Sequence, residues 1–144
     1  MSQTTEQRLV HLVARIGLAF IFAYHGLVPK LLGPHPDELT VLTAGGISAA
    51  RAVTLVMVTG VAEILFAFAL LAFWNHRWPL ILSIAAMFLA LISVTVNAPH
   101  QLSAAFNPVS LNLAVVCLAV IDLIILRRLP SESRARPVSE NGDD

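Results

Sequence analysis

Four long runs of apolar residues alternate with short polar stretches along the chain. The runs cover residues 9–32, 52–74, 78–96 and 109–126. At ~1.5 Å per residue, a helix of such a length approaches the ~30 Å thickness of the hydrocarbon core of a bilayer. The second and third runs have no polar stripe of helical period, which a soluble bundle would need. The pattern therefore predicts an all-α integral membrane protein whose single domain, residues 1–128, is a four-helix transmembrane bundle.

The segments between the runs add three structural expectations. The connection around residues 75–77 is so short that the second and third helices must be antiparallel neighbours. Pro36, followed by two acidic residues, favours the start of a short helix in the first long connection. Pro29 should kink the first helix, because its ring clashes with the carbonyl of His25. Small and polar residues at helical spacing predict an inward face on the third helix: Ala86, Ala90, Ser93 and Asn97.

Composition and charge agree with a membrane protein and suggest its orientation. Apolar residues make up 57% of the chain, charged residues 12%, and the net charge is zero, which argues against a nucleic-acid partner. Only two basic residues, Lys30 and Arg51, lie on one side of the predicted membrane, whereas the side of the termini has more. The positive-inside rule therefore places both termini in the cytoplasm. The basic residues on the side of the termini are Arg8, Arg15, Arg77, Arg127, Arg128, Arg134 and Arg136. Residues 129–144 are predicted to form a disordered cytoplasmic tail. The first apolar run is predicted to be a transmembrane helix and not a cleaved signal peptide.

Ionisable residues inside the apolar runs are the candidates for function. A carboxylate near the bilayer centre costs about 2.5–3.5 kcal/mol on insertion scales, so Glu63 must be paired, protonated or functional. His25 reaches the outer half of the membrane from the first helix. The depth of each residue along its helix predicts an outward-facing polar pocket formed by His25, Lys30, His35, Glu38, Glu63, Asn97, His100 and Asn112. A purely structural lock between the helices is the alternative.

A second polar pair is predicted toward the cytoplasmic end. Asp122 lies about one turn from the end of the fourth run, and Arg15 reaches a similar depth on the first. A structural ion pair between them is the preferred interpretation. Cys117 is the only cysteine, so the chain offers no thiol pair for a disulfide or a CxxC motif.

Three functional classes fit the polar pocket. A divalent metal such as zinc or iron could be held by His25, Glu63 and His100, although their spacing matches no tight ligand motif. A quinone would need hydrogen-bond donors, a group that exchanges protons and an apolar wall. Glu63 could relay protons there, and the wall could come from Phe20, Phe22, Phe66 and Phe106. The third class is a non-enzymatic scaffold subunit in which the polar groups only fix the helices.

Short motifs give the chain a resemblance to a known family. They are the stretch Arg15-Ile16-Gly17-Leu18, then Gly26 and Lys30-Leu31 in the first helix, and Gly60-Val61-Ala62-Glu63 in the second. The chain resembles the DoxX family of four-crossing membrane proteins. The resemblance implies a bacterial inner-membrane protein associated with redox chemistry, because relatives include small subunits of a thiosulfate:quinone oxidoreductase. It also implies redox protein partners or a homo-oligomer, and it assigns the family's glutamate, glycine and lysine to Glu63, Gly26 and Lys30.

Overall fold

The protein is a bundle of four long helices with a short helix across one end. The computed structural model describes residues 3–104 and 107–129, and every regular element in these ranges is helical. The long helices are α1 (Gln3–Gly26), α3 (Ala49–Ala72), α4 (Trp78–Asn97) and α5 (Pro108–Arg128). The short elements are the π-helix η1 (Leu27–Leu31), which continues α1, the helix α2 (Pro36–Ala44) and the 3₁₀-helix η2 (Pro99–Ser103). The predicted all-α, four-helix architecture is confirmed, while Phe106 and residues 130–144 of the predicted tail lie outside the described residues.

All four long helices have the dimensions of membrane spans. Residues 5–31, Ala49–Ala72, Trp78–Asn97 and Pro108–Arg128 are each long and apolar enough to cross a bilayer. Their outer surfaces carry large exposed apolar side chains such as Phe20, Phe68, Leu89 and Val96. In water such a surface would be unfavourable, whereas in a bilayer it faces acyl chains. The lengths and apolar surfaces of these helices are therefore those of a multi-pass membrane protein.

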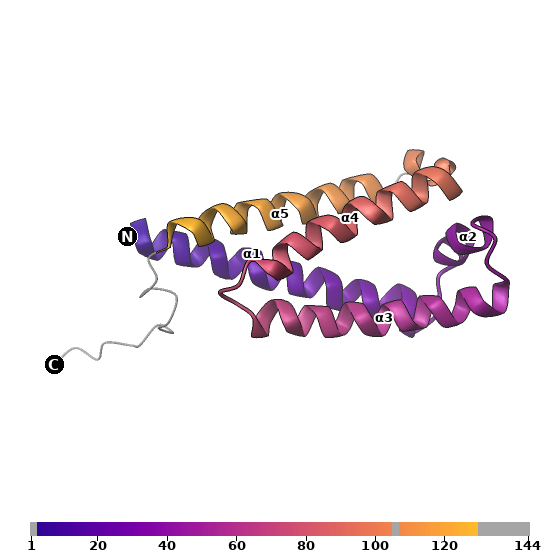
Figure 1. Cartoon of the computed structure of the whole chain (residues 1–144), viewed down its shortest axis with the longest axis horizontal. Coiled ribbons are helices and arrows are strands. Elements are labelled where there is room, and N and C mark those ends of the chain that lie inside the picture. The colour runs from indigo at the N-terminus through magenta and orange to yellow at the C-terminus, as the bar shows by residue number, and fades with distance from the viewer. Residues whose placement is uncertain (1–2, 105–106, 130–144) are drawn as a thin grey trace.

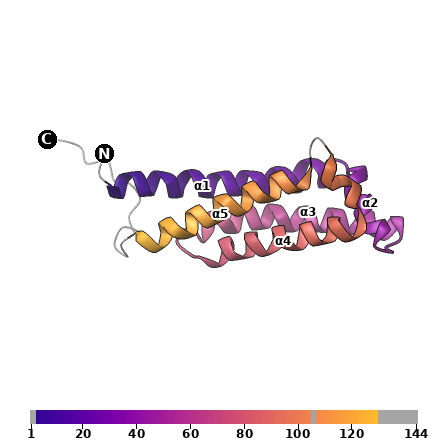
Figure 2. The ribbon, with the colours of Figure 1, turned by 90° about the horizontal axis from the view of Figure 1, so that it is seen from above.

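The helices run along one common direction, and the two ends of the bundle differ (Figures 1 and 2). The start of α1, the turn between α3 and α4 and the end of α5 lie at one end, here called the terminal end. The elements α2 and η2 lie at the other, here called the capped end. In the packing, α1 is central because it contacts both α3 and α5, while α4 packs mainly against α5.

Proline and short polar residues define where the helices begin. The His35 side chain accepts a hydrogen bond of 3.3 Å from the backbone N–H of Asp37, and Pro36 occupies the first turn of α2. Asn107 caps α5 in the same way, accepting a 3.0 Å hydrogen bond from the N–H of Ser110. The expected short helix at Pro36 is thus present, and it starts at the predicted residue.

The closest approach between long helices is the crossing of α1 and α3. A Cβ atom at Gly26 would lie 2.5 Å from the carbonyl oxygen of Gly60, and one at Gly60 would lie 2.8 Å from the carbonyl oxygen of Gly26. Only residues without a side chain fit at both positions, as at other close crossings of membrane helices. Two of the predicted pocket residues, Lys30 and Glu63, lie directly beside this crossing.

The packing of α4 differs from the expectation. Ala90, predicted on the inward face, is exposed, and the buried residues of α4 are Pro79, Leu80 and Ser83 near the terminal end. The reason is that α4 has few contacts with α3 and packs against α5 instead. The pattern of small residues identified helix surfaces suited to close packing, but the tertiary arrangement brings no neighbour to Ala90.

Candidate functional site

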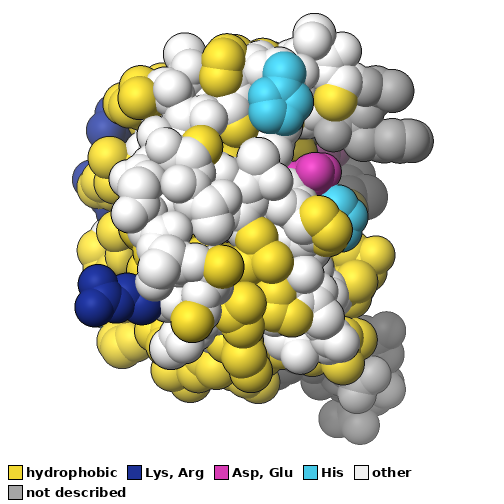
Figure 3. Space-filling view, turned by 90° about the vertical axis from the view of Figure 1, so that its right-hand side faces the viewer, with side chains coloured by type: hydrophobic (Ala, Val, Ile, Leu, Met, Phe, Trp, Pro, Cys, Tyr) yellow, Lys and Arg dark blue, Asp and Glu magenta, His cyan; other side chains and the backbone are white. Residues whose placement is uncertain are grey.

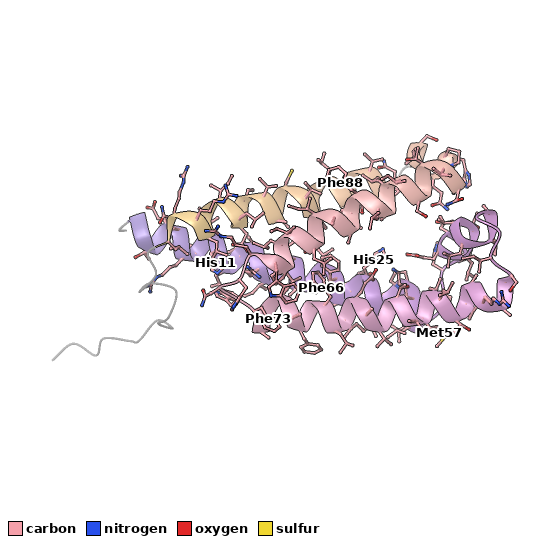
Figure 4. The ribbon with its side chains drawn as sticks, viewed as in Figure 1. His11, His25, Met57, Phe66, Phe73 and Phe88 are labelled. Carbon is pink, nitrogen blue, oxygen red and sulfur yellow. The ribbon has the colours of Figure 1, made fainter. Side chains whose placement is uncertain are left out.

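A cluster of four ionisable side chains lies beside the crossing of α1 and α3. The Glu63 carboxylate of α3 accepts a hydrogen bond of 2.5 Å from Nζ of Lys30, and its other oxygen lies 3.2 Å from Nδ1 of His25. Figure 4 shows the His25 side chain beside α3, toward the end of the bundle that carries α2. The two residues whose proximity matters most for the predicted site, His25 and Glu63, are therefore in direct contact.

Glu38 of α2 is the fourth member of the cluster. Its Oε1 lies 3.8 Å from Nε2 of His25 and 3.8 Å from Nζ of Lys30. Lys30 is buried, whereas the side chains of His25 and Glu63 remain 38% and 23% exposed. The cluster, called the Glu63 cluster below, contains two carboxylates, one ammonium and one imidazole. Its formal charges balance when the imidazole carries a proton.

The π-helix η1 explains how His25 and Lys30 reach the same carboxylate. In an α-helix, residues five positions apart point about 140° away from each other. Pro29 has no N–H to donate and crowds the carbonyl of His25, so this turn is wider, with the N–H of Leu32 bonded 2.9 Å to the carbonyl of Leu27. The wide turn brings Lys30 to the side that carries His25. The effect expected of Pro29 on the helix thus takes the form of a π-helical turn.

Among the described residues, the other predicted pocket residues form no side-chain hydrogen bond or ion pair with the cluster. His35 serves as the cap of α2, and the Asn97 amide donates a 3.0 Å hydrogen bond to the carbonyl of Ser93 in its own helix. His100 is exposed in η2, and Asn112 is buried on α5. Figure 3 looks onto the capped end, where histidine and carboxylate side chains stand among mainly uncharged and hydrophobic ones.

The metal alternative requires three ligands at one point. Within residues 3–104 and 107–129, no group of three His, Cys, Asp or Glu side chains is placed to hold a metal ion. His25 and Glu63 are in contact, whereas His100 lies in η2 and, among the described residues, forms no side-chain hydrogen bond or ion pair with either. Within the described ranges, the predicted ligand set of His25, Glu63 and His100 is therefore not assembled as a metal site.

A second polar cluster lies at the terminal end. Nε of Arg15 is 2.6 Å from Oδ2 of Asp122, and both side chains are completely buried. The contact is a buried ion pair between α1 and α5. The Arg15 guanidinium also donates to three backbone carbonyls in and after the last turn of α3, at distances of 3.2, 3.5 and 2.6 Å: those of Leu70, Phe73 and His76. The predicted partners are thus side by side, and Arg15 additionally joins α1 to the turn between α3 and α4.

His11 is a member of this second cluster that the sequence reasoning missed. Its Nδ1 is hydrogen-bonded to Asp122, and its ring packs edge-on against Trp74 with centroids 4.9 Å apart. Figure 4 shows His11 toward the terminal end of the bundle, away from His25. The spacing of the two residues could have indicated this role, because His11 precedes Arg15 by four residues and both therefore lie on the same side of α1.

Of the aromatic residues expected to line the site, Phe20, Phe22 and Phe66 lie within the described residues. Phe22 and Phe66 pack edge to face in the core, with centroids 4.8 Å apart. Phe20 belongs to an apolar groove of about 260 Å³ between α1 and α3, lined by Ile16, Ala19, Phe20, Ala23, Ile64, Ala67, Phe68 and Leu71. Because His25 is nine residues from Ile16, it projects from the opposite side of α1. The groove and the cluster are therefore separate features.

The fold and the buried charge clusters define a class: a multi-pass membrane protein with ionisable side chains held between its helices. Residues 19–120 match the model of the DoxX-like family, which is more than two thirds of the chain. The protein therefore belongs to the DoxX-like family, as its motifs suggested. Neither the curated proteins nor the solved structures gave a match. The matched range includes all four residues of the Glu63 cluster and ends before Asp122.

Proposed function

We propose that this protein is a membrane subunit of a redox system, and that the Glu63 cluster exchanges protons with a quinone or quinol. The observation that carries the proposal is the direct contact of Glu63 with both His25 and Lys30 inside membrane-spanning helices. The proposal includes a bacterial inner-membrane location with cytoplasmic termini, as the arrangement of basic residues favours. The capped end and the cluster near it then face outward.

His25 is the proton-exchanging group. An ionised carboxylate can only accept a hydrogen bond, so Nδ1 of His25 must donate one to Glu63. The neutral imidazole therefore carries its hydrogen on Nδ1, and Nε2 is free to act as a base. A carboxylate behind an imidazole fixes the tautomer and stabilises the imidazolium that forms when Nε2 takes a proton. His25 can thus accept a proton from a quinol hydroxyl, or return one to a quinone.

Lys30 stabilises negative charge on the reacting oxygen. Its ammonium group is held at 2.5 Å by Glu63 and is buried, so its position is fixed before the ligand arrives. A fixed cation in a partly dehydrated site lowers the free energy of an oxygen that is losing its proton. The hydrogen bond to Glu63 also satisfies the ammonium group when no ligand is bound.

The reaction balances with a redox partner. Oxidation of a quinol releases two electrons and two protons. Nε2 of His25 takes the proton of the hydroxyl that it contacts and passes it to water at the capped end, since this side chain is partly exposed. The second hydroxyl, on the opposite side of the ring, releases its proton to water. The electrons pass to the redox centre of a partner subunit. Reduction of a quinone follows the same route in reverse.

The test compares ligand binding with stability. Glu63→Gln and His25→Ala should each weaken binding of a short-chain benzoquinol to the protein in nanodiscs by about tenfold. His25→Ala removes the imidazole that accepts the quinol hydrogen, and Glu63→Gln removes the carboxylate that holds both His25 and Lys30 in place. His100→Ala is the matched control, since this histidine is exposed and its side chain has no hydrogen bond or ion pair to the described cluster residues. If both cluster variants bind the quinol as the wild type does and only unfold more easily, the scaffold alternative is correct.

A further inference from the structure

The position of Glu38 in the cluster is unusual because two groups converge on one of its oxygens. Nε2 of His25 and Nζ of Lys30 are both 3.8 Å from Oε1 of Glu38. These distances exceed those of hydrogen bonds, whereas the contacts of Glu63 with the same two residues are 3.2 and 2.5 Å. Glu38 is therefore held by charge attraction alone and is the weakly bound member of the cluster.

The helix that carries Glu38 packs against α3 and α4 at the capped end. None of the nine residues of α2 is buried. The segment before α2 contains Gly33, around which a side chain would find open space, and the segment after it contains Gly46 with a φ of +88°. A hydrogen bond of 3.2 Å from the Gln101 amide to the carbonyl of Asp37 connects α2 to η2. Elements with few buried contacts open at low free-energy cost.

We propose that Oε1 of Glu38 occupies the binding position of a quinol oxygen, and that α2 is a lid that withdraws Glu38 when the quinol binds. This inference rests on the proposed function and specifies its binding site. Nζ of Lys30 and Nε2 of His25 are the two atoms that recognise the ligand oxygen.

The chemistry of these two atoms matches a hydroxyl group. Nζ of Lys30 can only donate a hydrogen bond, and Nε2 of the neutral imidazole can only accept one. An oxygen between them must therefore accept from Lys30 and donate to His25, which a quinol hydroxyl does and a carboxylate cannot do. After the proton has moved to Nε2, both groups donate, and the oxygen that remains is the acceptor they require.

The charges of the cluster also favour the exchange. With Glu38 present, two carboxylates share one ammonium group and an imidazole that is charged only when protonated. When a neutral quinol replaces Glu38, the remaining pair of Lys30 and Glu63 is balanced. The Glu38 carboxylate is partly exposed and can move into water at the capped end, where its solvation offsets the loss of a weak ion pair.

The experiment removes the charge of Glu38 and measures both the position of α2 and the affinity for the quinol. Glu38→Gln should open the lid more often and tighten binding of a short-chain benzoquinol by about fivefold, the effect of removing a partly exposed ion pair that competes with it. Asp37→Asn is the matched control, because it removes a carboxylate from the same first turn of α2, and Asp37 is 70% exposed and contacts His35 instead of the cluster.

Lid position is read from the distance between spin labels on Thr40→Cys, an exposed site on α2, and the native exposed Cys117 of α5. The distance distribution should broaden in Glu38→Gln and remain as in the wild type in Asp37→Asn. An unchanged distribution in Glu38→Gln, or weaker quinol binding, would overturn the inference. If the lid opens but neither wild type nor variant binds the quinol, the proposed function and the quinol site fail together, while the latch formed by Glu38 stands.

Discussion

The crossing of α1 and α3 gives the sharpest prediction about stability. In Gly26→Ala, the new Cβ would lie 2.5 Å from the Gly60 carbonyl oxygen and 3.0 Å from Cβ of Glu63. Ordinary contacts between heavy atoms begin near ~3.5 Å, so the two helices must separate by roughly 1 Å at this point. Overpacking of this kind costs about 1–3 kcal/mol, and the better helix propensity of alanine returns about 0.5–1 kcal/mol. Taking the middle of each range, the expected net loss is roughly 1 kcal/mol.

Gly17→Ala is the matched control in the same helix. A Cβ at Gly17 would meet its nearest neighbour, Cδ1 of Leu118, at 3.8 Å, which is an ordinary contact. This variant should therefore gain up to about 1 kcal/mol from helix propensity. The assay is unfolding of the purified protein by titration of mild-detergent micelles with SDS, followed by the fluorescence of Trp74 and Trp78.

The two substitutions are expected to shift the midpoint in opposite directions. Gly26→Ala should also weaken quinol binding, because separation of the helices lengthens the contact between Lys30 and Glu63. The reasoning is refuted if Gly26→Ala unfolds at the same SDS fraction as the wild type, or shifts the midpoint in the same direction as Gly17→Ala.

Two further predictions concern the terminal end and the orientation of the chain. Arg15→Met should destabilise the protein by about 3–5 kcal/mol in the same SDS titration, because it leaves the Asp122 carboxylate buried without its guanidinium partner; a loss below about 1 kcal/mol would show that this pair is dispensable. In a Cys117→Ser background, Ser48→Cys should react with a membrane-impermeant maleimide added to intact cells, and Glu6→Cys should react only after the membrane is opened. The reverse labelling pattern would contradict cytoplasmic termini.

The membrane spans could be predicted from sequence because the property that defines them is local. Whether a run such as residues 78–96 enters hydrocarbon depends on its own length and apolarity, with little contribution from its neighbours. Helix starts are similarly local, and Pro36 begins α2 as expected. The boundaries are less accurate: α1 begins at Gln3, several residues before the apolar run, because polar residues at a helix end can extend beyond the lipid.

The partners of the buried charges were only partly predictable. The depths of Arg15 and Asp122 along their helices were enough to pair them, because antiparallel helices bring residues of equal depth together. His11 was missed, since nothing in its immediate sequence shows that it lies against Asp122. His35, Asn97 and His100 have depths close to that of the cluster, but in the folded chain His35 and Asn97 form other hydrogen bonds and His100 is exposed.

The sequence by itself determined which segments are helices suited to lipid and which few ionisable groups lie within them, because both follow from the free energy of each residue in hydrocarbon. Only the tertiary structure decided that Lys30 and His25 share Glu63. That outcome depends on the wide turn at Pro29 and on the close crossing at Gly26 and Gly60, which set the rotation and separation of two helices. Rotation and separation arise from packing between segments distant in sequence, so no local pattern contains them.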